Sequence, residues 1–339
     1  MNIRLHLQPL TQRLWQSRPA TIRLFLTKLI CITMIFLQRI QWACVLLVLA
    51  ACATVPPAAK PGVTVTESTP APLPAPAPPP KKIPKLGLAL GGGAARGFAH
   101  IGVLQVLEEE GIKPSLVVGT SAGSVVASFY ASGKSGQQLQ WLADNMDETQ
   151  FTDWANPFSG RGILRGEALG KYINSQLNGM KIEDMKLPLG IVATDLRTGE
   201  GILFRRGDVT TAVRASSAVP SVFEPVQIAG KDYVDGGLVS PVPVRFARQM
   251  GADLVLAVDI SSRPEDAKTT DVLKVLLQTF SIMGKSISQL ELAQADVVVR
   301  PALPDIGSTE FSARKKSIEA GRAAMKQAMP QLRALLAAP

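Results

Sequence analysis

The sequence predicts an α/β fold in which helices cover a mainly parallel central sheet. Short apolar segments of strand length recur between residues 85 and 301, and segments with helical character separate them. Two of these apolar segments end in glycine-containing turns that lead directly into a helix. This alternation is typical of parallel sheets, because a parallel connection needs a crossover that is usually a helix. A hydrophobic content of 46% and a charged content of 19% suit a globular protein with a sizeable core.

The first strand–turn–helix unit covers residues 85–111. The apolar run at 85–90 predicts a strand, the loop 91–97 reads GGGAARG, and apolar residues at helical spacing predict a helix over 98–111 that Gly111 ends. Backbone N–H groups in such a loop, together with the N-terminus of the helix, form a binding site for anions. The unit therefore indicates an anion or oxyanion site after the first strand.

Dinucleotide binding is the alternative interpretation of this loop, and the spacing of its glycines argues against it. In a G-x-G-x-x-G pattern counted from Gly91, the third glycine falls on Arg96. Counted from Gly92, the pattern is broken by Ala94. No acidic residue follows a strand about twenty residues later, where a ribose-binding carboxylate would lie.

The second strand–turn–helix unit covers residues 114–133 and centres on a serine. Its turn reads Gly119-Thr120-Ser121-Ala122-Gly123, the G-x-S-x-G pattern of a nucleophile elbow. The elbow needs very small neighbours because the serine lies in a strained turn between strand and helix. A simple turn between strand and helix is the alternative, but this context favours a nucleophilic Ser121.

No histidine follows Ser121 in the sequence, so the base that would activate this serine has to be sought elsewhere. The sequence has two histidines, His6 and His100, and both precede Ser121. His100 lies at the start of the predicted helix 98–111 among apolar residues, which favours a structural role. Asp235 remains: it ends a short β-like run and precedes Gly236 and Gly237, which let the backbone approach another element closely. From these three residues alone, an ordinary Asp-Gly turn is the stronger interpretation.

The remaining elements complete the predicted fold. Apolar runs at 187–196, 252–260 and 295–301 predict strands, and an alanine-rich segment at 314–336 predicts a terminal helix. The sequence contains no internal repeat.

Taken together, these blocks resemble the patatin-like phospholipase family of serine lipid acyl hydrolases. The family's glycine-rich loop matches 92–97, its elbow matches 119–123, and its Asp-Gly-Gly block matches 235–237. Residues 213–226 resemble the segment that precedes the family's aspartate. Two departures are that Ala94 replaces a loop glycine, and that Ser-Pro-Val-Pro-Val follows where many members carry asparagines.

The resemblance implies a three-layer α/β/α fold and a Ser–Asp dyad that hydrolyses phospholipids or other acyl esters without a metal or cofactor. We expect Ser121 to be the nucleophile and Asp235 the base. The backbone N–H groups of Gly92 and Gly93, with Ala94 as a third candidate, are expected to bind the oxyanion. Arg96 has two open interpretations, support of the loop or stabilisation of developing charge. The further motif residues are Gly97, Gly119, Gly123, Gly236 and Gly237. A lipoprotein on the same fold that binds lipids or partner proteins without turnover is the alternative function.

The N-terminal region has the features of a bacterial lipoprotein leader. An apolar run of about ten residues ends in Leu49-Ala50-Ala51-Cys52, which resembles a lipobox in which Cys52 becomes the lipidated N-terminus. Because Ala53 rather than Asp follows, we expect an anchor on the periplasmic face of the outer membrane. An uncleaved N-terminal anchor is the alternative, and Met34 is a second possible translation start. Residues 52–84 are rich in proline and alanine, which predicts an extended tether.

Charge and cysteine distribution exclude several classes of function. The first 51 residues hold six of the 36 Lys/Arg and none of the 27 Asp/Glu, which leaves a net charge of only +3 for the rest. No nucleic-acid-binding surface is therefore expected. All three cysteines lie within the first 52 residues, which excludes a disulfide framework or a cysteine-ligated metal further along.

The predicted organisation has four parts. Residues 1–51 form the signal peptide and 52–84 the tether. Residues 85–300 form the catalytic domain, and 301–339 form a C-terminal helical extension.

Overall fold

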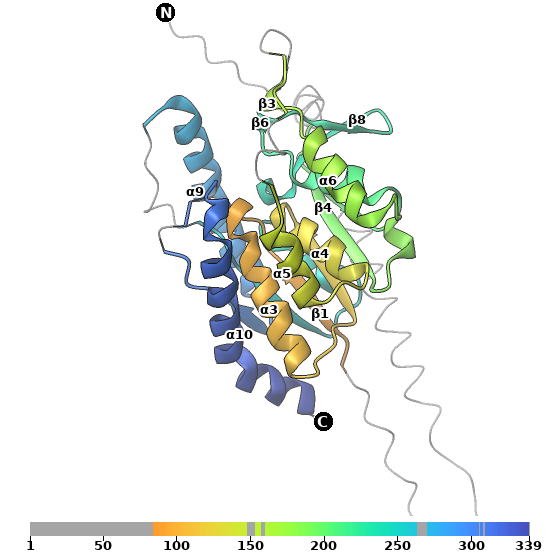
Figure 1. The fold of residues 1–339 in the computed structure, drawn as a ribbon, viewed down its shortest axis with the longest axis vertical. Coiled ribbons are helices and arrows are strands. Elements are labelled where there is room, and N and C mark those ends of the chain that lie inside the picture. The colour runs from red at the N-terminus through yellow and green to blue at the C-terminus, as the bar shows by residue number, and fades with distance from the viewer. Residues whose placement is uncertain are drawn as a thin grey trace, which may run out of the picture. The chain divides into compact units, whose positions relative to one another are not determined.

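The computed structural model describes residues 84–147, 153–156, 160–262, 270–304, 306–307 and 309–338. Its main sheet has eight strands in the order β10-β9-β1-β2-β4-β8-β7, with β5 paired to β4 (Figure 1). The strands are β1 (Leu86–Leu90), β2 (Leu116–Thr120), β4 (Leu189–Asp195), β5 (Gly201–Phe204), β7 (Val226–Ile228), β8 (Lys231–Asp235), β9 (Leu254–Val258) and β10 (Val297–Val299). A second, two-stranded sheet pairs β3 (Gly162–Leu164) with β6 (Ser221–Phe223).

The helices connect and cover these strands. They are α3 (Phe98–Glu109), α4 (Ala122–Ala131), α5 (Gly136–Asp144), α6 (Glu167–Leu177), α7 (Val209–Ser216), α8 (Val244–Gln249), α9 (Val272–Leu292) and α10 (Arg314–Ala337). Two short 3₁₀ turns, η2 (Ala94–Gly97) and η5 (Gly236–Leu238), follow β1 and β8. The strands predicted at 85–90, 187–196, 252–260 and 295–301 and the helices predicted at 98–111 and 314–336 are confirmed.

Hydrophobic cores lie on both faces of the sheet, so the fold has three layers. Successive side chains of a strand point to opposite faces, and the cores follow this alternation. In β1, Leu88 and Leu90 pack with α3, α4 and α10, whereas Ala89 packs in the core that contains α8 residues and Leu292 of α9. The predicted α/β fold with a mainly parallel central sheet is therefore confirmed.

Three strands of the sheet are antiparallel to their neighbours, which the sequence did not predict. β10, β9, β1, β2 and β4 pair in parallel, but β5 and β8 run antiparallel to β4, and β7 runs antiparallel to β8. The sheet is therefore parallel at its centre and mixed at one side. β8 runs from the carboxyl end of β4, where Tyr233 lies opposite Asp195, back to Ala193, which lies opposite Asp235.

The C-terminal helix α10 packs along α3, and the two lie side by side in Figure 1. Two glycines permit this close approach. A Cβ on Gly102 would lie 2.0 Å from the carbonyl oxygen of Ile318, and one on Gly321 would lie 2.0 Å from that of Ala99. Helix α10 thus contributes to the same core as the sheet, and the predicted division at residue 300 stays a prediction.

The predicted leader and nearly all of the predicted tether, with Cys52, lie outside the described residues. Among the helices of the described ranges, none has the length and apolar character needed to cross a bilayer.

Candidate active site

Ser121 occupies the turn between β2 and α4. Its backbone dihedrals, φ 52° and ψ −123°, lie in a region that residues other than glycine rarely adopt. Two glycines make the turn possible. A Cβ on Gly119 would lie 2.4 Å from the carbonyl oxygen of Gly123, and one on Gly123 would lie 2.1 Å from that of Leu90. The turn therefore has the strained geometry of a nucleophile elbow.

Strand β4 brings Asp235 beside Ser121. In the parallel pairing of β2 with β4, Thr120 lies opposite Val192. In the antiparallel pairing of β8 with β4, Asp235 lies opposite Ala193. The two partner residues on β4 are consecutive in the sequence. Their pairing therefore places Asp235 next to Thr120, the residue that precedes Ser121.

The Asp235 carboxyl is buried and accepts a hydrogen bond from the Gly237 N–H to Oδ1 at 2.7 Å. Burial raises the pKa of Asp235 to about 6, although the neighbouring Ser121 hydroxyl and the Gly237 N–H act to lower it. Near neutral pH the carboxyl is therefore ionised, and it is a stronger base than an exposed aspartate.

The glycine-rich loop lies against the elbow, but Gly92 cannot offer its N–H to a ligand. That N–H donates to the Pro241 carbonyl at 2.9 Å. The prediction that the Gly92 amide binds the oxyanion is therefore corrected. Its small size matters instead, because a Cβ there would lie 3.1 Å from the Cβ of Ser121.

Several other N–H groups of the loop and the elbow have no acceptor in the described ranges. They include those of Gly93, Ala94 and Ala122, the last being the first residue of α4, whose N–H has no intrahelical acceptor. Ala94 has φ 50°, so an alanine holds a left-handed position where the resembled family has glycine. Ala122 was not predicted from the sequence, although its place directly after the candidate nucleophile is a position from which an elbow supplies an oxyanion donor.

The side chains of Arg96 and His100 form hydrogen bonds with backbone carbonyls in and around the loop. The buried Arg96 guanidinium donates from Nε to the Ile260 carbonyl at 2.9 Å and also reaches the Ile306 carbonyl. His100 is fully buried, and its Nε2 lies 2.8 Å from the Gly91 carbonyl oxygen, which can only accept, so Nε2 carries the hydrogen. Burial lowers the pKa of His100 to about 4, which keeps the ring neutral. Both side chains therefore support the loop.

A short segment at the C-terminal end of α7 contacts both Ser121 and Asp235, and its contacts were not predicted. The Ser216 hydroxyl accepts a hydrogen bond from the Ser121 N–H at 2.9 Å and donates to the Val192 carbonyl at 2.6 Å. The Ala218 carbonyl accepts from the Asp235 N–H at 2.9 Å. The segment lies within residues 213–226, which resemble the segment before the family's aspartate. The sequence alone predicted no role for these residues.

The other glycines of the motifs act by allowing close approach. A Cβ on Gly236 would lie 2.2 Å from the Val192 carbonyl oxygen, and one on Gly97 would lie 2.9 Å from the Cβ of Ala122. Gly237 supplies its N–H to Asp235. No group of three or more His, Cys, Asp or Glu side chains that could hold a metal ion occurs in the part of the chain that the structure describes.

Several known proteins have sequences similar to this chain. Residues 88–248 match the family model of patatin-like phospholipases. An uncharacterized NTE family protein of Mycobacterium tuberculosis is 36% identical over 178 residues, which cover 52% of this chain and 49% of that protein. The human patatin-like phospholipase domain-containing protein 6 is 33% identical over 193 residues, covering 55% of this chain and 14% of that protein.

The chain spans about half the length of the mycobacterial relatives that it matches. Among solved structures, VipD from Legionella pneumophila aligns with a TM-score of 0.47 at 16% identity, over 74% of this chain and 67% of that one. The sequence match covers both the elbow and the Asp-Gly-Gly block. Residues 88–248 are therefore similar to the patatin-like phospholipase family.

Proposed function

We propose that this chain is a serine lipid acyl hydrolase in which Ser121 is the nucleophile and Asp235 the base. One observation carries the proposal: strand pairing places a strained elbow serine beside a buried carboxyl whose pKa is raised to about 6. A perturbed carboxyl in contact with a candidate nucleophile is a common feature of catalytic sites. The similarity of residues 88–248 to the patatin-like phospholipases supports a phospholipid or a related acyl ester as the substrate.

In the first half of the reaction, Ser121 Oγ attacks the ester carbonyl carbon and its proton passes to the Asp235 carboxylate. The resulting oxyanion accepts hydrogen bonds from the free N–H groups of Gly93, Ala94 and Ala122, each worth about 3 kcal/mol to the transition state. The ester C–O bond then breaks, and the departing alcohol takes the proton from Asp235. In the second half, water attacks the acyl-serine, Asp235 accepts the proton of the water, and Ser121 leaves with that proton.

The function is tested on the purified full chain with phospholipid vesicles and a fluorophosphonate probe. We expect release of free fatty acid and covalent labelling that peptide mapping assigns to Ser121. A chain that binds vesicles but releases no fatty acid and takes no label would favour the alternative, a lipid-binding protein without turnover.

The rate should depend on pH through Asp235. Because the free carboxyl must be ionised to accept a proton, we expect kcat/KM to fall about tenfold per pH unit below pH 6 and to level off above it. His100, with its pKa lowered to about 4, does not titrate in this range. A pH–rate profile on a soluble ester measures the step, and a profile that is flat between pH 5 and 7 would contradict the assignment.

The Ser216 hydroxyl should matter for rate more than for binding. Ser216→Ala leaves the Ser121 N–H and the Val192 carbonyl unpaired in a buried position, at a cost of about 1–3 kcal/mol, and releases the elbow. We expect kcat to fall about 100-fold with KM nearly unchanged, because the elbow positions the nucleophile. Ser217→Ala is the matched control, since the Ser217 hydroxyl is buried without a hydrogen-bond partner in the described ranges. Equal losses in the two variants would show that Ser216 has no special positioning role.

We further propose that the chain is anchored to a membrane, on the periplasmic face of the outer membrane, through a lipidated Cys52. The proposal is supported by the Leu49–Cys52 sequence at the end of an apolar run and by the proline-rich segment that follows it. Mass spectrometry of the protein from cells should find an acylated Cys52 as the mature N-terminus, and Cys52→Ser should leave the leader uncleaved or release the protein into the soluble fraction. An unmodified Cys52 within an intact leader would contradict the anchor.

A further inference from the structure

Helix α9 carries a row of large apolar side chains that face solvent. Five of them, Val272, Val275, Ile282, Met283 and Leu290, are more than half exposed, with Val272 at 87% and Leu290 at 73%. At 100° per residue, they fall within an arc of about 100° along one side of the helix. We call this row the α9 stripe.

The helix packs on the fold mainly through its C-terminal part. Its buried residues are Ser288, Glu291 and Leu292, and Gly284 lies against Pro241, since a Cβ on Gly284 would lie 3.6 Å from Pro241 Cγ. The N-terminal turns have no buried residue, and Figure 1 shows this end of the helix standing away from the sheet. Because α9 runs back across the sheet from β9 to β10, its exposed end lies toward the carboxyl ends of the parallel strands, where Ser121 is also found.

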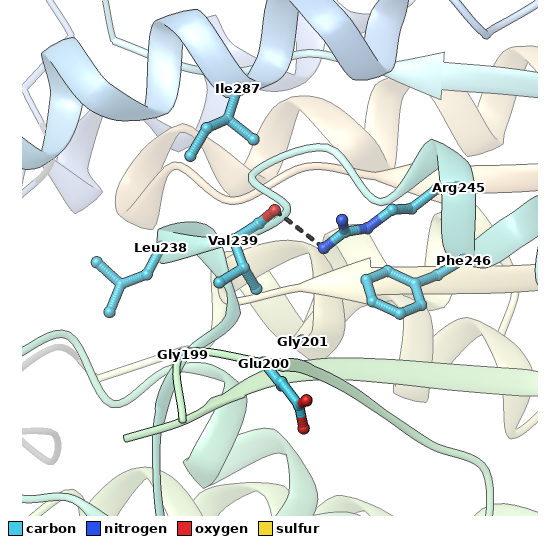
Figure 2. A pocket seen from close by; sticks show the side chains of 8 residues that line it. All are labelled: Gly199, Glu200, Gly201, Leu238, Val239, Arg245, Phe246 and Ile287. Atoms are coloured by element: carbon cyan, nitrogen blue, oxygen red, sulfur yellow. Dashed lines mark hydrogen bonds between the residues drawn. The ribbon is translucent and has the colours of Figure 1, made fainter. Parts of the chain in front are cut away.

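An open pocket of about 740 Å³ lies between α9 and the turn that follows Asp235. Figure 2 shows Ile287 of α9 on one side of it and Leu238 and Val239 beside it. Leu238 ends η5, the 3₁₀ turn that begins directly after Asp235. The remaining lining residues are Gly199, Glu200, Gly201, Arg245 and Phe246. The pocket thus lies beside α9 and beside the turn that begins after Asp235.

The charges of α9 suit a phosphate-bearing surface. Between residues 272 and 290 the charged residues are Lys274 and Lys285, and both are exposed. Lys274 also pairs with Asp271, which precedes the helix. The acid within the helix, Glu291, is buried, accepts a hydrogen bond from the Val244 N–H and pairs with Arg245.

The small size of the stripe argues for lipid over a protein partner. A stable protein–protein interface takes about 20–30 residues from each side, whereas the stripe offers five. An amphipathic helix that lies in a membrane interface needs only an apolar row with cations beside it.

We propose that the α9 stripe docks on the surface of a phospholipid bilayer, with the helix lying in the plane of the interface. The apolar side chains enter the acyl boundary, the lysines meet lipid phosphates, and the pocket beside η5 faces the membrane. This inference rests on the proposed function in one respect: it takes the substrate to lie in the bilayer. Docking is measured without any turnover of substrate, so the docking inference and the proposed function can fail separately.

The test uses the full chain with Cys52→Ser, so that no lipid anchor is attached, and vesicles of phosphatidylcholine with phosphatidylglycerol. We expect Val275→Asp together with Met283→Asp to lower the ratio of bound to free protein in flotation at least tenfold. Trp141→Asp with Ala334→Asp is the matched control, because it adds the same charge at exposed positions of α5 and α10 on the other face of the sheet. Soluble-ester turnover should be the same in both double variants, which verifies the fold.

Hydrogen exchange reads the contact directly. Adding vesicles should slow exchange in peptides from residues 272–283 and leave peptides from α10 unchanged. Unchanged exchange in 272–283 would overturn the proposal, as would a parent protein that light scattering shows to be a dimer and the stripe variant to be a monomer. Vesicle docking by a parent protein that hydrolyses neither lipid nor ester would uphold the inference and refute the proposed function.

Discussion

Ser121→Ala is expected to lower kcat for ester hydrolysis about 10⁶-fold, the loss typical for removal of a catalytic serine. The reason is that, in the proposed mechanism, Ser121 forms the covalent bond to the acyl group, and its backbone has the strained geometry of a nucleophile elbow. Rates on a soluble ester and labelling by a fluorophosphonate measure the loss, and we expect both to disappear. Folding should be unaffected, because the Ser121 N–H still reaches Ser216.

Ser128→Ala is the matched control for this substitution. Ser128 is a buried serine of the same helix α4, and its hydroxyl donates to the Val125 carbonyl at 2.8 Å. Its rate and labelling should stay within about twofold of the parent protein, since this bond lies outside the proposed machinery. Persistent labelling of the Ser121→Ala protein would place the nucleophile elsewhere in the chain.

Asp235→Asn is expected to lower kcat about 10³- to 10⁴-fold. The amide keeps the size of the side chain but cannot accept the Ser121 proton. The step in the pH profile near pH 6 should vanish in this variant, because its source is the Asp235 carboxyl. Since burial disfavours the ionised carboxyl, the neutral side chain should leave thermal stability at pH 7 equal or higher.

Asp232→Asn on the same strand is the control for this loss. Asp232 pairs with Arg161, and its substitution should change kcat less than twofold. Near-normal turnover in Asp235→Asn, together with a folded but inactive His100→Ala protein, would transfer the role of base to the histidine.

Much of the site could be predicted from the sequence because its parts are local. The elbow at 119–123 and the loop at 92–97 are each defined by a few consecutive residues, whose small side chains permit a turn that others would block. Strand and helix periodicity around them gave β1, α3, β2 and α4 with boundaries within a few residues. The sequence alone also shows that no histidine follows Ser121, and this predicted a carboxylate as the base.

Other features depended on residues that are distant along the chain. Whether Asp235 is an ordinary turn residue or a partner of Ser121 follows from the pairing of β2 and β8 with β4, and strand pairing is set by packing across the whole sheet. The same is true of Gly92, whose N–H is taken by the Pro241 carbonyl.

The sequence by itself determined the α/β fold, the position of the strained serine and the absence of a histidine after it. These features follow from local spacing and composition. Only the tertiary structure decided which loop amides stay free, that Arg96 and His100 hold the loop, and that Ser216 ties the elbow to β4. It also decided that α9 presents its apolar row to solvent, since a helical apolar pattern alone predicts burial. The physical reason is the same in each case: hydrogen-bond partners and burial are properties of neighbours in space, which a one-dimensional pattern does not specify.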